Sequence, residues 1–96
     1  MKTDAKALIL QPSEGLELNA FGDTLTLKLG GEQTKGSLVL AFDVTPPGGG
    51  PPPHVHRNED ELFIVQAGRV SFCVEGEWTE VAPGGVIYLP RDVIHC

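Results

Sequence analysis

The residues of this chain that could do chemistry gather in two short segments. All three histidines lie there: His54 and His56 in the first segment, and His95 in the second. Alternate residues of a β-strand point to the same face, so a strand at this position would present His54 and His56 side by side. Imidazole suits Fe, Mn, Ni, Cu or Zn, and no cysteine stands beside this pair, which argues against a structural zinc site with thiolate ligands.

A carboxylate follows the histidine pair closely, and there are three candidates: Glu59, Asp60 and Glu61. Glu61 opens an apolar run, where a buried carboxylate is costly unless it is paired or bound to a cation. We therefore favour Glu61 as a ligand and as the sole candidate acid or base, and assign Glu59 and Asp60 to a solvated turn. The alternative is that these are unconnected polar residues at strand ends. It does not explain why all three histidines lie in these two segments. The expected metal ligands are His54, His56, Glu61 and His95.

Two stretches of the sequence resemble the two motifs of the cupin superfamily. Residues 48–68 (GGGPPPHVHRNEDELFIVQAG) match the first motif at the required spacing, at Gly48, His54, His56, Glu61 and Gly68. Residues 84–95 (GGVIYLPRDVIH) match the second motif at Gly84, Pro90 and His95. Asp92 replaces the middle glycine of the second motif, and aspartate is among the few residues tolerated in left-handed turn conformations.

The resemblance implies an all-β fold, an antiparallel jelly-roll (cupin) barrel formed by residues 1–96 as a single domain. It also implies a divalent transition metal (Fe, Mn, Ni, Zn or Cu) on three histidines and one glutamate, with positions left open for water or substrate. The terminal asparagine of the second motif would fall beyond Cys96. We therefore expect either a barrel that lacks its last strands or an edge completed by a partner chain.

The similarity extends to the small quercetin-dioxygenase-like cupins. It implies a metal-dependent oxygenase that acts on a small organic molecule, with Glu61 as ligand and proton acceptor. One alternative is a non-catalytic module that binds or senses a small molecule through the metal. Another is a cupin isomerase or epimerase, because one fold serves all of these functions.

The sequence predicts that the elements positioning these residues are short strands. Apolar runs rich in Val, Ile, Leu and Phe are broken by Gly and Pro, and no segment shows helical periodicity. Gly68-Arg69 is a two-residue connection suited to a tight hairpin between the strands that flank it. The expected strands are residues 25–29, 37–44, 61–67, 70–74, 78–81 and 86–89.

Composition excludes several classes of function. The net charge is −6 and the seven basic residues are scattered, which disfavours nucleic acid. No stretch approaches the ~20 apolar residues that span a bilayer, and the N-terminus lacks the apolar core of a signal peptide. Cys73 and Cys96 fit a reducing cytoplasm, and a disulfide between them is the less favoured alternative. We expect a small-molecule ligand and a homodimer.

Overall fold

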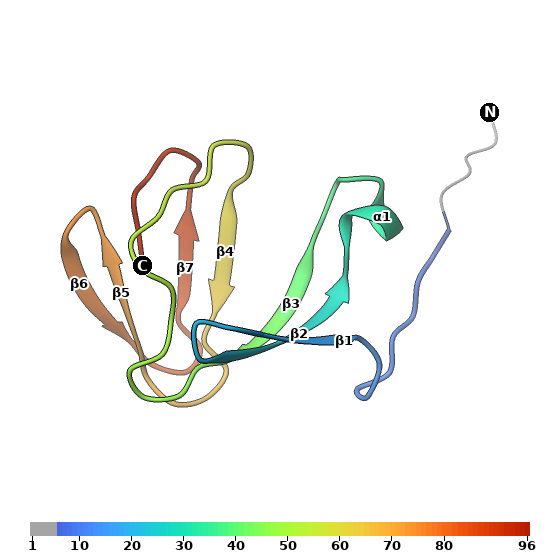
Figure 1. The fold of residues 1–96 in the computed structure, drawn as a ribbon, viewed down its shortest axis with the longest axis horizontal. Coiled ribbons are helices and arrows are strands. Elements are labelled where there is room, and N and C mark those ends of the chain that lie inside the picture. Colours follow the sequence, from blue (N-terminus) through green and yellow to red (C-terminus); the bar gives the residue numbers. More distant parts are fainter. Residues whose placement is uncertain (1–5) are drawn as a thin grey trace. The chain divides into compact units, whose positions relative to one another are not determined.

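The computed structural model describes residues 6–96, which belong to two compact units, Met1–Gly50 and Pro51–Cys96 (Figure 1). Strands dominate both units, and every strand pairing is antiparallel. The predicted all-β class is therefore confirmed, with one short helix as the exception. A single closed barrel over residues 1–96 stays a prediction. Across residues 6–96, no helix has the length and apolar content that would take it through a lipid bilayer.

The first unit contains an antiparallel sheet in the order β1-β2-β3. Its strands are β1 (Leu16–Ala20), β2 (Asp23–Leu29) and β3 (Leu40–Val44). Strand β1 was not predicted. It forms a hairpin with β2 through Phe21 and Gly22, whose φ angles of 51° and 83° both lie in the left-handed region. Two consecutive left-handed residues give a turn whose twist matches that of the flanking strands.

A single helical turn, α1 (Gly31–Thr34), separates β2 from β3 and was also not predicted. It is too short to show a helical period in the sequence. Gly30 donates its N–H to Gln33 Oε1 at 2.7 Å, and Lys35 ends the turn with a φ of 54°. Thr34 Oγ1 then accepts the N–H of Leu38 at 3.2 Å. These bonds hold the chain before residue 40 in a turn. Strand β3 therefore begins at Leu40, three residues later than the predicted start at residue 37.

The second unit contains two strand pairs, β4 with β7 and β5 with β6. Its strands are β4 (Glu61–Ile64), β5 (Val70–Val74), β6 (Glu77–Val81) and β7 (Val86–Leu89). The predicted hairpin of β4 with β5 through Gly68-Arg69 is wrong. Strand β4 ends at Ile64, and Val65 bonds instead to the turn before β7, donating to Gly85 O at 3.0 Å and accepting from Gly84 N at 2.8 Å.

Strand β5 forms its hairpin with β6 through Glu75 and Gly76, whose φ angles of 49° and 86° supply the tight turn. Alternation along β4 is as predicted. Glu61, Phe63 and Val65 point to the more buried face, while the other face of β4 is exposed. Phe63 meets Phe72 of β5 with ring centroids 5.3 Å apart. This half-buried aromatic contact lies on the same face of β4 as Glu61.

Candidate metal centre

His54 and His95 are held opposite one another by a short antiparallel bridge. Each donates its backbone N–H to the carbonyl oxygen of the other at 2.9 Å. His95 also faces Val74, the last residue of β5. The bridge therefore connects the segment before β4 to the segment after β7, and it attaches both to β5.

His56 and Glu61 reach the same place from the segment that enters β4. The carbonyl of His56 accepts the N–H of Asp92 at 2.8 Å, which ties this segment to the turn after β7. Asp92 has a φ of 69°, as predicted for a residue that replaces a motif glycine. Glu61 is the first residue of β4 and pairs with Leu89, the last residue of β7. Strand pairing thus brings a carboxylate to the end of the sheet where the histidines lie.

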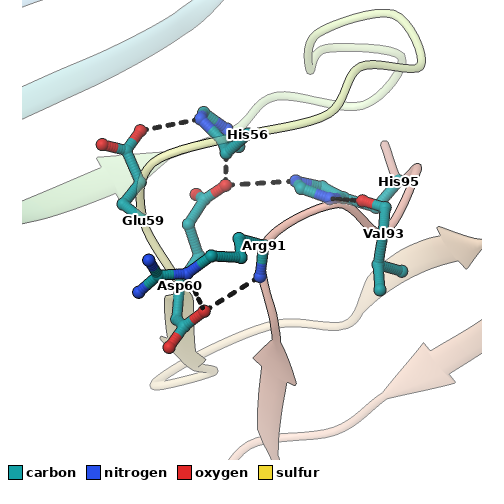
Figure 2. Close-up of polar contacts among 7 residues, drawn as sticks. His56, Glu59, Asp60, Arg91, Val93 and His95 are labelled. Carbon is teal, nitrogen blue, oxygen red and sulfur yellow. Dashed lines mark hydrogen bonds and ion pairs between the residues drawn. The ribbon is translucent and has the colours of Figure 1, made fainter.

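The structure brings all four predicted ligands together. One potential ligand atom from each of His54, His56, Glu61 and His95 lies within 4.8 Å of the others. Glu61 Oε1 is 2.6 Å from His56 Nε2 and 3.2 Å from His95 Nε2. Figure 2 shows dashed lines from the rings of His56 and His95 that meet at one carboxylate oxygen. His95 is 5% exposed and Glu61 has 26% of its side chain exposed, so the group is partly open to solvent.

Each histidine ring is oriented by a hydrogen bond at Nδ1. The partners are Pro52 O for His54 at 2.8 Å, Glu59 Oε1 for His56 at 2.8 Å and Val93 O for His95 at 3.1 Å. Carbonyl and carboxylate oxygens only accept, so each Nδ1 carries the hydrogen. In a neutral ring the Nε2 atom then presents a lone pair. This pattern, with Nδ1 donating to oxygen and Nε2 free, is the usual state of a metal-ligating histidine.

Within residues 6–96, two of the four candidate ligand atoms are left without hydrogen-bond partners. Glu61 Oε1 and His95 Nε2 are both buried and make no hydrogen bond within the described residues. With His95 Nε2 unprotonated, their 3.2 Å separation brings two lone pairs together, which a metal ion or a proton between them would relieve. Three imidazole nitrogens and one carboxylate oxygen are a donor set that suits a divalent transition metal. The residues present thus fit the predicted ion.

The two rival carboxylates support the site from its edge. Asp60 Oδ1 accepts the backbone N–H of Arg91 at 2.9 Å and its Nε–H at 3.2 Å (Figure 2). These bonds from the Arg91 backbone and side chain hold the pKa of Asp60 below its usual range. The hydrogen bond to Asp60 in turn raises the pKa of the Tyr88 hydroxyl. Asp60 thereby fixes the turn that leads from β7 to His95.

Glu59 has a role that the sequence interpretation missed, since it was assigned to a solvated turn. The side chain is exposed, yet it reaches back to the Nδ1 atom of His56. Its position three residues after His56, in a polar stretch that bends the chain, was the available signal. The acceptors for His54 and His95 are backbone carbonyl oxygens, which the residue types in the sequence do not reveal.

Comparison with known proteins agrees with this geometry. An uncharacterised protein of Streptomyces coelicolor is 43% identical over 37 residues, which cover 38% of this chain and 35% of that protein. The chain thus matches only 35% of the length of this relative. The family model of the cupin domain matches residues 42–96, more than half of the chain, and this range includes the four predicted ligands. This protein belongs to the cupin domain family.

Proposed function

We propose that this cupin binds one divalent transition-metal ion through His54, His56, Glu61 and His95, and that it is a metal-dependent oxygenase. The observation that carries the metal assignment is the orientation of the rings. Three Nδ1 atoms are occupied by oxygen acceptors, and two of the Nε2 atoms approach the same oxygen of Glu61. Without a metal ion or a proton between them, the imidazole lone pairs would face the carboxylate oxygen of Glu61.

The donor set also indicates the class of substrate. Three neutral imidazoles and one carboxylate cancel only one of the two charges of a divalent ion, so the site favours an ionised oxygen. When bound, the ion supplies Lewis acidity and, for Fe or Mn, redox capacity toward dioxygen. A small molecule with an enol, phenol or carboxylate group fits these requirements.

In this proposal Glu61 has two roles. It is a metal ligand through Oε1, and it accepts a proton from the substrate. The partial exposure of its side chain, 26%, supports the second role, because a buried Oε1 alone would give a substrate no access. A quercetin-dioxygenase-like activity is the specific form of the proposal. A homodimer and a cytoplasmic location stay predictions.

Elemental analysis of the purified chain tests the metal site. We expect a single ion per chain in the wild type and a sharp loss in His95→Ala. The matched control is Glu77→Ala, which removes a carboxylate from the exposed start of β6 and should leave the metal content unchanged. Circular dichroism would verify that both variants fold. Full occupancy in the His95→Ala protein would contradict the four-ligand assignment.

Oxygen uptake tests the reaction. Protein loaded with Fe or Mn should consume dioxygen in the presence of one or more members of a panel of phenols and diketones. The His56→Ala variant is the control and should show no uptake. Conversion of a substrate without oxygen uptake would point to an isomerase or epimerase. Tight binding without any conversion would point to a non-catalytic module, and either result would overturn the oxygenase.

A further inference from the structure

The two cysteines of the chain lie directly opposite one another across a pair of strands. Cys73 donates its N–H to Cys96 O at 3.0 Å, and Cys96 donates to Cys73 O at the same distance. The neighbouring pair is Val74 with His95, followed by a 3.0 Å bond from Glu75 N to Ile94 O. The end of the second unit therefore extends the β5 ladder, with Cys96 in register with Cys73.

This register places the two thiols within reach of each other. Residues that exchange both backbone bonds have Cα atoms about 5.5 Å apart, and their side chains share one face. That spacing lies inside the range of about 4.4–6.8 Å found for disulfides. Both cysteines are free and partly accessible to solvent.

We propose that Cys73 and Cys96 form a site of reversible oxidation, where a low-molecular-weight disulfide such as oxidised glutathione converts both thiols to an intramolecular disulfide. One cysteine thiolate attacks the small disulfide, forms a mixed disulfide and releases one small thiol. The second cysteine attacks the mixed disulfide, forms the Cys73–Cys96 bond and releases the other small thiol. Two electrons pass from the cysteine pair to the oxidant, and its two thiols take up the two protons.

The predicted disulfide is easily reduced. Directly opposite Cβ atoms in a ladder lie about 4.5–5.5 Å apart, whereas a relaxed disulfide brings them to about 3.8 Å. The strands must approach slightly to close the bond, and strained disulfides are the labile ones. Such a bond would form under oxidative conditions and be lost in a reducing compartment.

The position of the pair couples oxidation to the metal site. Cys96 is joined by a peptide bond to His95, and Val74 beside Cys73 already faces His95. A covalent bond here keeps the His95 segment beside β5 and so restricts the movement of one proposed ligand away from the ion. Release of metal to a chelator should therefore be slower from the oxidised protein. This consequence rests on the proposed metal site, whereas disulfide formation does not.

The full chain, incubated with oxidised glutathione, provides the test of the disulfide. We expect the intact mass to fall by two hydrogen atoms, both thiols to resist alkylation, and reductant to restore them. Cys73→Ser and Cys96→Ser are the matched controls, and each should stop at a glutathione adduct. A wild type that yields only glutathione adducts, or disulfides between chains, would overturn the proposal.

The coupling is tested with zinc, which has no redox chemistry of its own. The rate of zinc transfer to a coloured chelator should be several-fold lower for the oxidised protein than for the reduced one. Equal rates would exclude the coupling while leaving the disulfide in place. A chain that binds no zinc in either state would refute the proposed metal site, and the mass measurement would still decide the disulfide.

Discussion

Glu59 holds the ring of His56 in the orientation that a metal ligand needs, although it lies outside the ligand set. Its Oε1 is 2.8 Å from Nδ1 of His56, and 62% of its side chain is exposed. Loss of a hydrogen-bond partner of a ligating histidine weakens metal affinity by about 10–100-fold. We expect a loss of this size for Glu59→Ala and a smaller one for Glu59→Gln, whose amide oxygen still accepts. Zinc competition against a chelator measures both.

The control for Glu59 is a carboxylate of similar exposure that serves another partner. Glu80 of β6 pairs with Arg69, the residue before β5, at 3.0 Å. Exposed ion pairs contribute little, so Glu80→Ala should leave zinc affinity unchanged. An equal loss of zinc affinity in both variants would show that the loss comes from the change in net charge. The orientation of His56 by Glu59 would then not contribute.

At the residue scale, the sequence predicted the four residues that the structure brings together but not the groups that orient their rings. His54 and His56 were found because alternate strand residues share a face, and Glu61 because a carboxylate opens an apolar run. Two of the three Nδ1 acceptors are backbone carbonyls, of Pro52 and Val93. Every residue has such a carbonyl, so only the folded backbone shows which ones are used.

Gly85 belongs to the turn that joins β6 to β7 and holds the end of β4. Its carbonyl accepts the N–H of Val65, and a Cβ atom at Gly85 would lie 2.2 Å from Val81 Cγ1 and 3.0 Å from the carbonyl oxygen of Ala82. The valine can move but the backbone oxygen cannot move easily. We expect Gly85→Ala to lower the free energy of unfolding by about 1–3 kcal/mol, as overpacking typically does.

Urea denaturation followed by the fluorescence of Trp78, the one tryptophan of the chain, measures the effect of Gly85→Ala. Gly36 is a poor control because its φ of 79° would strain any side chain. Gly31 lies in the first unit, whose unfolding Trp78 does not report, so the control is Ser71→Ala at an exposed position of β5 in the second unit. Unchanged stability of Gly85→Ala would mean that the Val81–Gly85 turn adjusts freely.

Asp43 on β3 makes the stability of the first unit depend on pH. Burial, followed by hydrogen bonding to and charge repulsion from Asp23, raises the pKa of Asp43 from 3.8 to about 6, although Thr45 opposes the shift. The folded state therefore binds a proton more tightly than the unfolded state. The stabilisation that proton binding to Asp43 gives the folded state is complete below pH 3.8 and is lost as the pH rises through about 6. We expect lower stability of this unit at pH 7 than at pH 5.

Denaturation of metal-free protein between pH 5 and 7, followed by NMR signals of β2 and β3, measures the role of Asp43. Metal-free protein is needed because protons also compete for metal ligands. In Asp43→Asn the side chain is neutral at every pH, so the dependence should disappear and stability at pH 7 should rise. If stability of the variant changes with pH as steeply as in the wild type, another group is responsible for the dependence.

At the scale of elements, alternation predicted most strands but not which strands pair. Both Gly68-Arg69 and Glu75-Gly76 could close a hairpin by sequence, and only the second does so. The pairing of β4 with β7 joins strands far apart in the chain, and no local pattern reports it. Strand β1 was missed although its sequence, LELNA, alternates apolar and polar residues, and the strand is exposed along its whole length.

At the scale of the whole molecule, the proposed metal ligands lie near the two ends of one compact unit. The second unit runs from Pro51 to Cys96, and its ligands begin at His54 and end at His95. A bound ion therefore closes nearly the whole of this unit into a loop. Among the described residues its buried apolar side chains are only Val65 and Leu89, so packing alone gives it little stability. The sequence motifs predicted the cupin family. They could not show that so few apolar side chains are buried in this unit.

Removal of the ion should therefore destabilise the second unit strongly. An ion that binds only the folded state contributes about 2.7 kcal/mol when its free concentration is 100 times its Kd. For a domain of this size each kcal/mol shifts the melting temperature by about 4–8 °C. Trp78 lies on β6 of the second unit, so its fluorescence reports this transition without a contribution from the first. Chelation at neutral pH should lower the Trp78 melting temperature by roughly ten degrees or more.

The His95→Ala protein is the control for chelation, because a chain that holds no ion cannot lose stability with it. Its melting temperature should lie near that of the chelated wild type and should not respond to chelator. Metal content is measured on the same samples. If the wild type loses its metal and Trp78 still melts at the same temperature, the ion does not stabilise the second unit. The four ligands would then serve binding or catalysis alone, on a unit whose strands hold together without them.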